Sequence, residues 1–290
     1  MRTLRIVCCL ALAAFGVVLS TSAATANPIH DLRVVGSVAV INGATFTTDN
    51  TQPLGTGHDQ FLGIQGPTSR PTNEGYNTDP NSNMEFDTQP GTNTDPLPLA
   101  GLTAVNGNYQ FLLDIDQTGV NSFLSLDRLE IYLGNSPTLT NFASGGAATN
   151  SALPGSQTTG FGANSVLVYN MDASPHGDAT VLLDFDNDLK GPGGSGIGDM
   201  LLLVPKSFFD PYAALFPYVY LYSRFGDTAD CLPNVEDGTC VNNGGPERWH
   251  AFSGLSTDSP PSAVPEPASL FLLGSGVVVA ANRIRRRKSS

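Results

Sequence analysis

The sequence predicts an all-β fold, an antiparallel β-sandwich of jelly-roll-like type with long loops. Short runs of alternating apolar and polar residues recur along the chain, and clusters of Gly, Pro, Asn and Asp separate them. Alternation with a period of two is typical of strands that bury one face. Apart from one possible turn in PKSFFDPYAALF, the region 27–263 has no convincing helical period. Many short strands with turn signals between them favour two packed sheets.

Eight segments are expected to be strands because they are rich in β-branched, aromatic and other apolar residues. In LSLDRLEIYL the inward-facing positions shift by one residue near Arg128, which predicts a β-bulge. YVYLYSRF is apolar or aromatic on both faces, so we expect a central strand that is covered on each side. The eight segments are 34–41, 109–115, 124–133, 166–170, 180–185, 200–204, 218–225 and 249–252.

Residues 1–26 have the features of a secretory signal peptide. Arg2 and Arg5 precede a short apolar stretch, and small residues follow it. Ala24 and Ala26 fit the small-x-small requirement of signal peptidase, so cleavage is expected after Ala26. A retained anchor is the alternative, but the apolar stretch is shorter than the roughly 20 residues of a bilayer span. The translocon and signal peptidase are therefore expected partners.

Residues 27–263 are expected to form one β-sandwich extracellular domain, although the length would also allow two small ones. Seven basic and 25 acidic residues give this region a net charge of −18. Such a charge argues against nucleic acid as a partner, because phosphates would be repelled. It favours solubility, divalent cations or basic partners, and a solvated acidic surface is the commonest explanation.

Two cysteines remain once the signal peptide is removed. Cys231 and Cys240 stand in CLPNVEDGTC, and in an exported protein they are expected to form a disulfide. The bond would close a short loop, which contributes about 2–3 kcal/mol in the chain-entropy model. A metal site is the alternative, but it would need more ligands than two thiols.

Aspartates follow two of the predicted strands, in FLLDIDQTG and in VLLDFDNDLKGPGGSGIGDM. The second segment contains Asp184, Asp186, Asp188 and Asp199. In an extended chain residues two apart face the same side, so the first three carboxylates would crowd together. A Ca²⁺ ion would relieve this repulsion, although the loop lacks the glycine and glutamate of an EF-hand. These four residues are candidate calcium ligands, and a solvated turn is the alternative.

No catalytic residue is assigned, and the protein is expected not to be an enzyme. The four histidines are scattered, and neither HExxH nor Gly-x-Ser-x-Gly occurs. GPGGSG satisfies the dinucleotide-binding pattern by chance, because a strand instead of a helix follows it. No cofactor other than Ca²⁺ is expected. A secreted hydrolase is the third alternative, and it would require two carboxylates or a Ser/His pair to converge in a cleft.

Residues 264–290 contain three adjacent features. Pro265, Glu266 and Pro267 come first, and residues 268–281 are mostly small or apolar. The apolar run is short for a stable span, and the positive-inside rule would hold the following basic residues in the cytoplasm. A plain C-terminal anchor is the alternative to an export signal. The basic residues are Arg283, Arg285, Arg286, Arg287 and Lys288.

These features resemble the PEP-CTERM sorting signal of Gram-negative bacteria. The resemblance implies handling by an exosortase, which cuts near the Pro-Glu-Pro motif and releases or transfers the protein to the outer surface. It also implies an association with exopolysaccharide-producing species. The three motif residues would then be recognition residues, and the apolar run a transient transmembrane helix. The final location would be the cell surface or the extracellular matrix.

The region before the tail is also similar to a group of PEP-CTERM proteins of unassigned function. The similar segments are INGATFTTDNTQPLGTG, NEGYNTD, FLLDIDQ, LSLDRLEIYLG, GSGIGDMLLLVP and YVYLYSRFG, in this order. This resemblance implies a recurring surface β-domain and names no substrate.

The function expected from the sequence is that of an exported surface or extracellular-matrix protein with a structural or adhesive role. The alternative is a calcium-assisted carbohydrate-binding module, with a platform formed by Tyr76, Tyr132, Trp249 and the Asp184 cluster. Aromatic side chains lying flat on an exposed face would favour sugar binding. Aromatic side chains buried between the sheets would favour the structural role.

Overall fold

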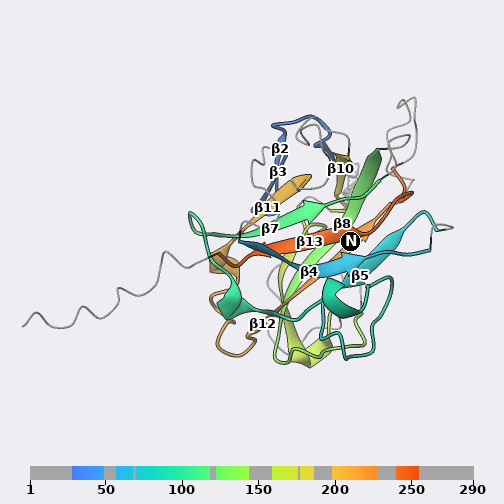
Figure 1. Cartoon of the computed structure of the whole chain (residues 1–290). Coiled ribbons are helices and arrows are strands. Elements are labelled where there is room, and N and C mark those ends of the chain that lie inside the picture. The colour runs from blue at the N-terminus through green and yellow to red at the C-terminus, as the bar shows by residue number, and fades with distance from the viewer. Residues whose placement is uncertain are drawn as a thin grey trace, which may run out of the picture.

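The protein consists of two β-sheets in the computed structural model (Figure 1). The model describes residues 28–48, 57–67, 70–117, 122–143, 159–175, 177–185, 198–226 and 240–254. The predicted signal peptide and the predicted sorting segment lie outside these residues. Within them, the helical elements are four 3₁₀ turns, η1 (Gly91–Asn93), η2 (Leu99–Gly101), η3 (Gly162–Asn164) and η4 (Lys206–Phe208).

Sheet 1 has seven strands, and its main path runs β1-β10-β8-β12-β5. All of its pairings are antiparallel except β1 with β10. Off the main path, β6 pairs with β12 and β9 pairs with β8. The strands are β1 (Ile29–Asp31), β5 (Asn73–Tyr76), β6 (Leu97–Pro98), β8 (Phe123–Gly134), β9 (Ser165–Asn170), β10 (Thr180–Asp184) and β12 (Tyr218–Phe225).

Sheet 2 has six strands in the order β2-β3-β11-β7-β13-β4, and all of its pairings are antiparallel. The β2–β3 hairpin turns at Asn42 and Gly43, which have φ values of 48° and 87°. Positive φ at both positions belongs to the type I′ turn, for which Asn-Gly is favoured. The strands are β2 (Val38–Ile41), β3 (Ala44–Thr47), β4 (His58–Ile64), β7 (Asn108–Asp114), β11 (Met200–Pro205) and β13 (Glu247–Phe252).

The main hydrophobic core is shared by the two sheets. Leu126, Ile131 and Leu221 of sheet 1 belong to the same buried cluster as Phe111 and Leu202 of sheet 2. Polar contacts also join the sheets, because Trp249 Nε1 donates to Ser223 Oγ at 3.0 Å. Two sheets that enclose one core are the arrangement that the alternating sequence pattern predicts.

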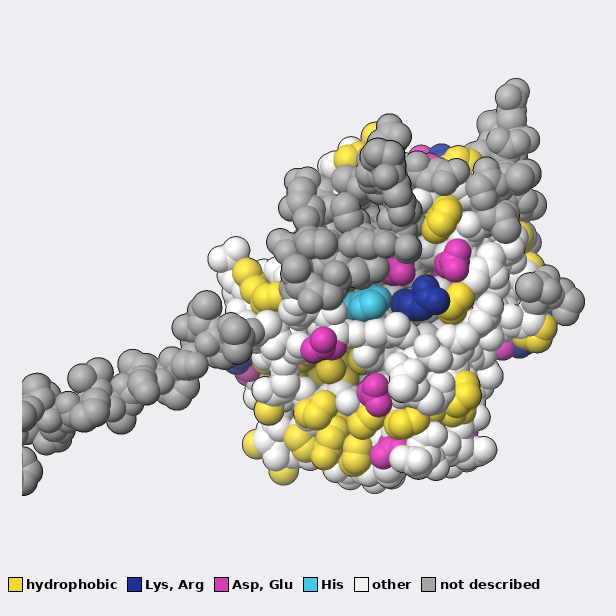
Figure 2. Space-filling view, viewed as in Figure 1, with side chains coloured by type: hydrophobic (Ala, Val, Ile, Leu, Met, Phe, Trp, Pro, Cys, Tyr) yellow, Lys and Arg dark blue, Asp and Glu magenta, His cyan; other side chains and the backbone are white. Residues whose placement is uncertain are grey.

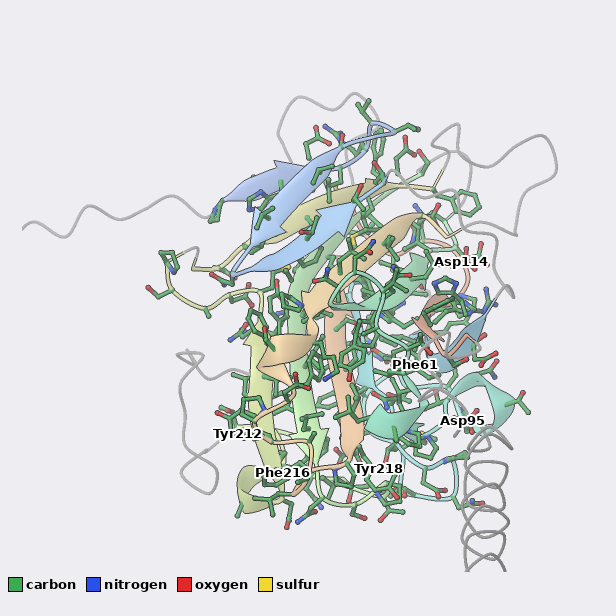
Figure 3. The ribbon with its side chains drawn as sticks, turned by 90° about the vertical axis from the view of Figure 1, so that its left-hand side faces the viewer. Phe61, Asp95, Asp114, Tyr212, Phe216 and Tyr218 are labelled. Carbon is green, nitrogen blue, oxygen red and sulfur yellow. The ribbon has the colours of Figure 1, made fainter. Side chains whose placement is uncertain are left out.

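Figure 3 shows residues from two separate regions of the body. Tyr212, Phe216 and Tyr218 lie at one end, where the chain passes from η4 into β12. Asp114 lies higher and toward the opposite side in this view, where β7 ends. Phe216 belongs to the main core cluster, Tyr212 packs against that cluster, and Tyr218 packs against a second aromatic cluster.

All eight segments predicted to be strands overlap a strand of the structure. The bulge is confirmed, because Arg224 pairs with Arg128 and Phe225 pairs with Leu126, which skips one residue of β8. The central position of β12 is also confirmed, between β8 and β5. One boundary was wrong: residues 34–37 form a turn, since Ser37 N donates to Val34 O at 3.1 Å and Gly36 has a φ of 82°.

Candidate functional site

The predicted sorting residues and basic anchor lie outside the described residues, but the structure shows where the chain leaves the body. Ser253 N donates to Gly57 O at 2.8 Å, and Thr103 Oγ1 donates to Gly254 O at 2.7 Å. Thr103 N also donates to Phe252 O at 3.0 Å. The end of β13 is therefore attached to two neighbouring segments. Gly254, the last described residue before the sorting motif, is therefore held in a fixed position on the body.

The predicted disulfide and calcium ligands are only partly described. Cys240 is buried at 2% exposure, and Cys231 lies outside the described residues, so their pairing stays a prediction. Asp186 and Asp188 also lie outside them. Across the parts of the chain that the structure describes, no three His, Cys, Asp or Glu residues gather into a potential metal site.

The two described calcium candidates occupy different sheets. Asp184 ends β10 in sheet 1, and its charge contributes to raising the pKa of Arg33, after the larger effect of Asp31. Asp199 is buried next to β11 in sheet 2, and its Oδ2 accepts a hydrogen bond from Ile115 N at 2.7 Å. Asp199 therefore holds the end of β7 against the start of β11. The calcium site itself stays a prediction.

The proposed aromatic platform is wrong for all three of its residues. Tyr76, Tyr132 and Trp249 are exposed by only 1%, 1% and 0%. Trp249 lies in the core between the sheets, and the two tyrosines lie in a separate cluster on the other face of sheet 1. Because a stacking platform must present ring faces to solvent, these side chains cannot form one. The alternation of β8 places Tyr132 on the outer face of sheet 1, while Ile131 and Leu133 face the core.

The separate cluster covers the outer face of sheet 1 with aromatic rings. Phe142 stacks on Tyr222 at 4.7 Å between ring centroids, and Phe161 contacts Tyr220 at 4.6 Å. Such pairs stabilise beyond their buried area. The members are Tyr76, Tyr132, Phe142, Phe161, Leu167, Tyr220 and Tyr222.

One carboxylate ties the loops over this cluster together. Glu85 accepts hydrogen bonds from the backbone N–H groups of Asn141 and Phe142, at 2.8 and 3.0 Å. It also accepts one from Tyr76 Oη at 2.6 Å. Burial, followed by the bond to Glu85, raises the pKa of Tyr76 well above its ordinary value. The phenol therefore stays protonated and serves as a donor that orders both loops.

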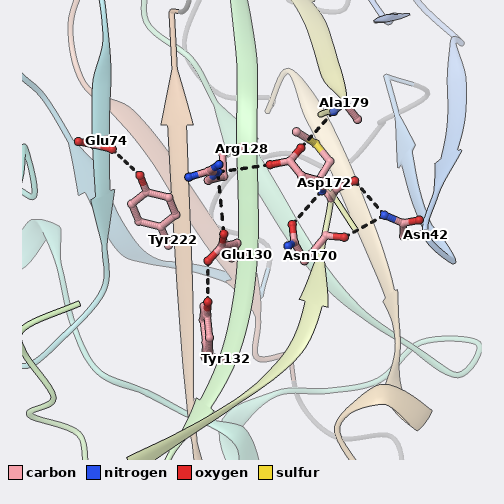
Figure 4. Close-up of polar contacts among 10 residues, drawn as sticks. Asn42, Glu74, Arg128, Glu130, Tyr132, Asn170, Asp172, Ala179 and Tyr222 are labelled. Atoms are coloured by element: carbon pink, nitrogen blue, oxygen red, sulfur yellow. Dashed lines mark hydrogen bonds and ion pairs between the residues drawn. The ribbon is translucent and has the colours of Figure 1, made fainter. Parts of the chain in front are cut away.

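A row of charged side chains runs across the same face beside the aromatic cluster (Figure 4). Arg128 Nε lies 3.3 Å from Asp172 Oδ2 and 3.9 Å from Glu130 Oε1. Tyr132 Oη donates to the other Glu130 oxygen at 2.6 Å. Glu130 is 1% exposed, so its charge needs these contacts. Tyr222 Oη donates to Glu74 in the same way.

Asp172 is the most unusual ionisable group in this row. Burial raises its pKa to about 7, against the opposing effects of Arg128 and of the hydrogen bond from Ala179 N. That bond has a length of 3.1 Å. A carboxyl with this pKa changes charge near neutral pH. No local sequence pattern indicates this contact, because Arg128 and Asp172 meet only through the pairing of β8 with β9.

The outer face of sheet 2 is more polar. Figure 2 shows a histidine beside a basic side chain on this face, with acidic side chains around them. Arg248 Nη1 of β13 lies 3.8 Å from Asp114 Oδ2 of β7. Burial, then His58 and Arg248, lowers the pKa of His250 to about 4. His250 is therefore neutral at physiological pH.

Glu247, at the start of β13, is fully buried. Gln117 Nε2 donates to its Oε1 at 3.2 Å. Burial, followed by the charge of Asp116, raises the pKa of Glu247 well above its ordinary value. Asn243 N donates in turn to Gln117 Oε1 at 3.1 Å. This chain of contacts attaches the segment before β13 to the segment after β7.

One small open pocket of about 240 Å³ lies between β9 and η4. Its lining is mostly apolar and includes one hydroxyl from Ser207 and one from Tyr212. The structure places no described acidic, basic or histidine side chain in this lining, so the pocket itself offers no acid or base. The lining residues are Leu167, Val168, Ser207, Phe208, Pro211 and Tyr212.

Comparison with known proteins bears on the C-terminal segment. A search of the curated proteins finds no match. Within the described residues, no helix has the length and apolar character to cross a membrane. The predicted transient helix lies beyond those residues. A protein-family model described as the PEP-CTERM protein-sorting motif matches residues 263–287. The chain therefore carries a PEP-CTERM protein-sorting motif, which implies export and processing by an exosortase.

Proposed function

We propose that this protein is a structural or adhesive component of the cell surface or extracellular matrix. The observation that carries the proposal is the sorting motif at residues 263–287. In this proposal the translocon exports the chain, signal peptidase removes residues 1–26, and the apolar run holds the C-terminal end in the inner membrane. Pro265, Glu266 and Pro267 then direct exosortase processing, while Arg283 to Lys288 stay in the cytoplasm.

The body supports a structural role through its packing. The aromatic side chains that could have stacked on a sugar are buried, and they fix loops to the outer face of sheet 1. The strand order also supports the jelly-roll-like fold that we propose. Four of the six strands of sheet 2 run in the order β4-β13-β7-β11, and four strands of sheet 1 run in the order β5-β12-β8-β10. In chain order these eight strands alternate between the two sets, except that β8 and β10 both lie in sheet 1, which is the order of two nested Greek keys.

The charged groups support the same role. Glu85 and Glu247 each accept hydrogen bonds that join two segments of the body, and Glu130 accepts one from Tyr132 of its own strand. Asp199 does so between β7 and β11. These contacts give each of these carboxylates a role in holding the fold. They favour a stable structural domain over a catalytic site.

The sorting step can be tested by Glu266→Ala and by deletion of residues 283–288. We expect both variants to reach the outer surface in much smaller amounts, and the tail to stay attached in the inner membrane fraction. Ser262→Ala, which lies just outside the matched segment, is the matched control. Protease shaving of intact cells, followed by blotting of both fractions, measures the distribution. Wild-type display of both variants would contradict the sorting proposal.

The structural or adhesive role needs a separate test. Cells lacking the protein should lose cohesion of the surface layer, measured as aggregation and resistance to shear. Re-expression of the wild-type chain should restore cohesion, and Glu266→Ala should not. Normal cohesion in deletion cells would contradict the role even if sorting is intact. Release of sugar fragments from exopolysaccharide by the purified chain would instead support the hydrolase alternative.

A further inference from the structure

The outer edge of sheet 2 carries an unusual strip of exposed valines. Val38 and Val40 of β2 are 61% and 59% exposed, and Val34 and Val35, in the preceding turn, are 70% and 42% exposed. Of the seven large hydrophobic residues that are exposed in the described parts of the chain, five lie between Ile29 and Val40. β2 is the terminal strand of its sheet, at the upper margin of the body in Figure 1.

The hydrogen-bonding groups of β2 alternate in direction. Thr48 N donates to Ser37 O at 3.0 Å, so residue 37 turns its backbone groups toward β3. In an antiparallel ladder such pairs alternate with pairs that face the other way. The register pairs Val38 with Thr47 and Val40 with Thr45. The N–H and C=O groups of Val38 and Val40 therefore point outward, away from β3.

The edge also lacks the features that normally prevent strand addition. Residues 34–48 contain no Asp, Glu, Lys, Arg or Pro, whereas the whole chain has a net charge of −12. Natural edge strands are commonly protected by charges, proline or bulges. β1, the adjacent edge of sheet 1, has such charges in Asp31 and the nearby Arg33, which form an ion pair at 2.7 Å. Two acidic copies of this chain can approach at β2 without placing like charges opposite each other.

We propose that β2 pairs with β2 of a second copy of this chain, antiparallel and centred on Ala39. In this register Val38 faces Val40 of the partner, and each such pair exchanges two backbone hydrogen bonds. The two-fold axis therefore gives four hydrogen bonds in which every outward N–H meets a C=O. The exposed valine side chains meet on the outer face, and Ala39 continues the core side of the sheet. The pairing joins two sheets into one continuous sheet across the dimer.

The proposal is tested by the mass of the full chain, purified in a mild non-ionic detergent, by light scattering over a concentration series. We expect the wild-type chain to form dimers. Val40→Pro removes an outward N–H and leaves the ladder with β3 intact, and it should weaken the dimer about tenfold or more, because two of the four hydrogen bonds are lost. Val38→Lys should act similarly through charge. Leu215→Lys, at a 70% exposed site away from β2, is the matched control and should stay dimeric.

A crosslinking experiment fixes the register and does not depend on the stability of those variants. Ala39→Cys places two thiols across a non-hydrogen-bonded pair, where the Cα atoms lie about 4.5 Å apart and a disulfide can form. Val38→Cys alone places them on a diagonal of about 7–8 Å, which is too far. Mild oxidation should therefore link Ala39→Cys chains, and Val38→Cys or wild-type chains much less.

Three results would overturn the proposal. The first is a wild-type chain that stays monomeric over the whole concentration series. The second is a dimer of equal strength in Val40→Pro and Val38→Lys, which would place the contact elsewhere, for example in the C-terminal apolar run. The third is equal crosslinking at positions 38 and 39. None of these results bears on surface sorting, so this proposal and the proposed function can fail separately.

Discussion

The sheet edges on the two sides of the body differ, because one is covered by a segment of the same chain and the other is exposed. On one side, residues 85–95 cover the outer edge of β4 through three backbone hydrogen bonds. Gln65 N donates to Asp87 O at 2.8 Å, and Gln89 N donates to Gly63 O at 2.8 Å. Asp95 N donates to Phe61 O at 3.0 Å. The same segment covers β5, because Asp87 N donates to Glu74 O at 2.9 Å. On the other side, β2 presents two exposed valines and outward backbone groups.

This difference explains the long polar segment between residues 63 and 101. Exposed strand edges are templates for pairing with other chains, so proteins cover or charge them. The segment supplies Thr88, which forms a bridge with Ile64, and it closes the gap between the two sheets. One side of the body is therefore sealed within the chain. The β2 side is the one proposed to pair with a second copy of the chain. Substitutions on each side can test this difference.

The largest effect is expected from Gly75→Ala on the sealed side. A Cβ at this position would lie 2.6 Å from Thr88 Oγ1 and 3.1 Å from Ile64 Cγ1. Thr88 cannot move away without loss, because its Oγ1 accepts from Tyr76 N at 3.2 Å. We expect the free energy of unfolding to fall by about 3 kcal/mol, measured by denaturant titration. Gly101→Ala, where nothing lies within 4 Å, should change it by less than about 0.5 kcal/mol. Equal effects of the two variants would contradict the tight seal.

Asp87→Ala should have the next largest effect. The Asp87 carboxylate is buried, pairs with Arg70 and accepts from Glu74 N at 3.2 Å. Its removal leaves a backbone donor without a partner, so we expect a loss of about 2 kcal/mol in the free energy of unfolding. Asp210→Ala breaks the exposed ion pair with Lys206 and should cost less than about 0.5 kcal/mol. A similar cost for both aspartates would show that residues 85–95 contribute little to stability.

The pH dependence should differ in sign between the two sides. Asp172 lies behind the β2–β3 turn, and its pKa of about 7 in the folded protein exceeds the unfolded value. The folded state then binds more protons, so the stability from this group is lost as pH rises through 7. His250, beside β4, has a folded pKa of about 4, below the unfolded value. The stability that His250 contributes is therefore lost as pH falls from about 6.5 toward 4.

Two variants separate these contributions. As pH rises from 5 to 8, the free energy of unfolding of Asp172→Asn should increase by roughly 2 kcal/mol relative to that of the wild type. Over the same rise in pH, the free energy of unfolding of His250→Asn should decrease relative to that of the wild type. Thermal or denaturant unfolding at each pH gives both differences. Because each variant is compared with the wild type, the titration of Glu247 and other groups cancels. Differences of the same sign in the two variants would refute the assignment.

The sequence predicts the long, regular strands better than the short ones. The eight predicted segments overlap β2, β7, β8, β9, β10, β11, β12 and β13, and the shift of the apolar pattern located the bulge near Arg128. β1, β3, β4, β5 and β6 were missed. Several of these are short or polar, such as NEGY in β5, and their strand conformation depends on pairing with distant strands. Such pairing leaves little local signal.

The candidate site was predictable only where it is local in the sequence. The sorting motif lies in one continuous stretch, and a family model matches it. The row formed by Arg128, Glu130 and Asp172 depends on the register of β8 with β9, so no local pattern announces it. The burial of Tyr76 and Tyr132 depends on which loops cover the outer face of sheet 1, and the burial of Trp249 depends on how the two sheets pack. One local signal was overlooked: Asn42-Gly43 between two apolar runs predicts a hairpin.

Asn42→Gly should produce the smallest effect, confined to the open side. The Asn42 Nδ2 atom lies 2.8–3.0 Å from the carbonyl oxygens of Asn170, Met171 and Ala173, so it attaches the β2–β3 turn to sheet 1. Glycine keeps the positive φ and loses these contacts, which should cost about 1 kcal/mol. Asn42→Ala should cost more, because alanine is strained at a φ of 48°. Amide hydrogen exchange should accelerate in β2 and β3 and stay unchanged in β4 and β13. Equal acceleration in all four strands would mean that the two sides unfold together, and the open edge would then be no more independent than the sealed one.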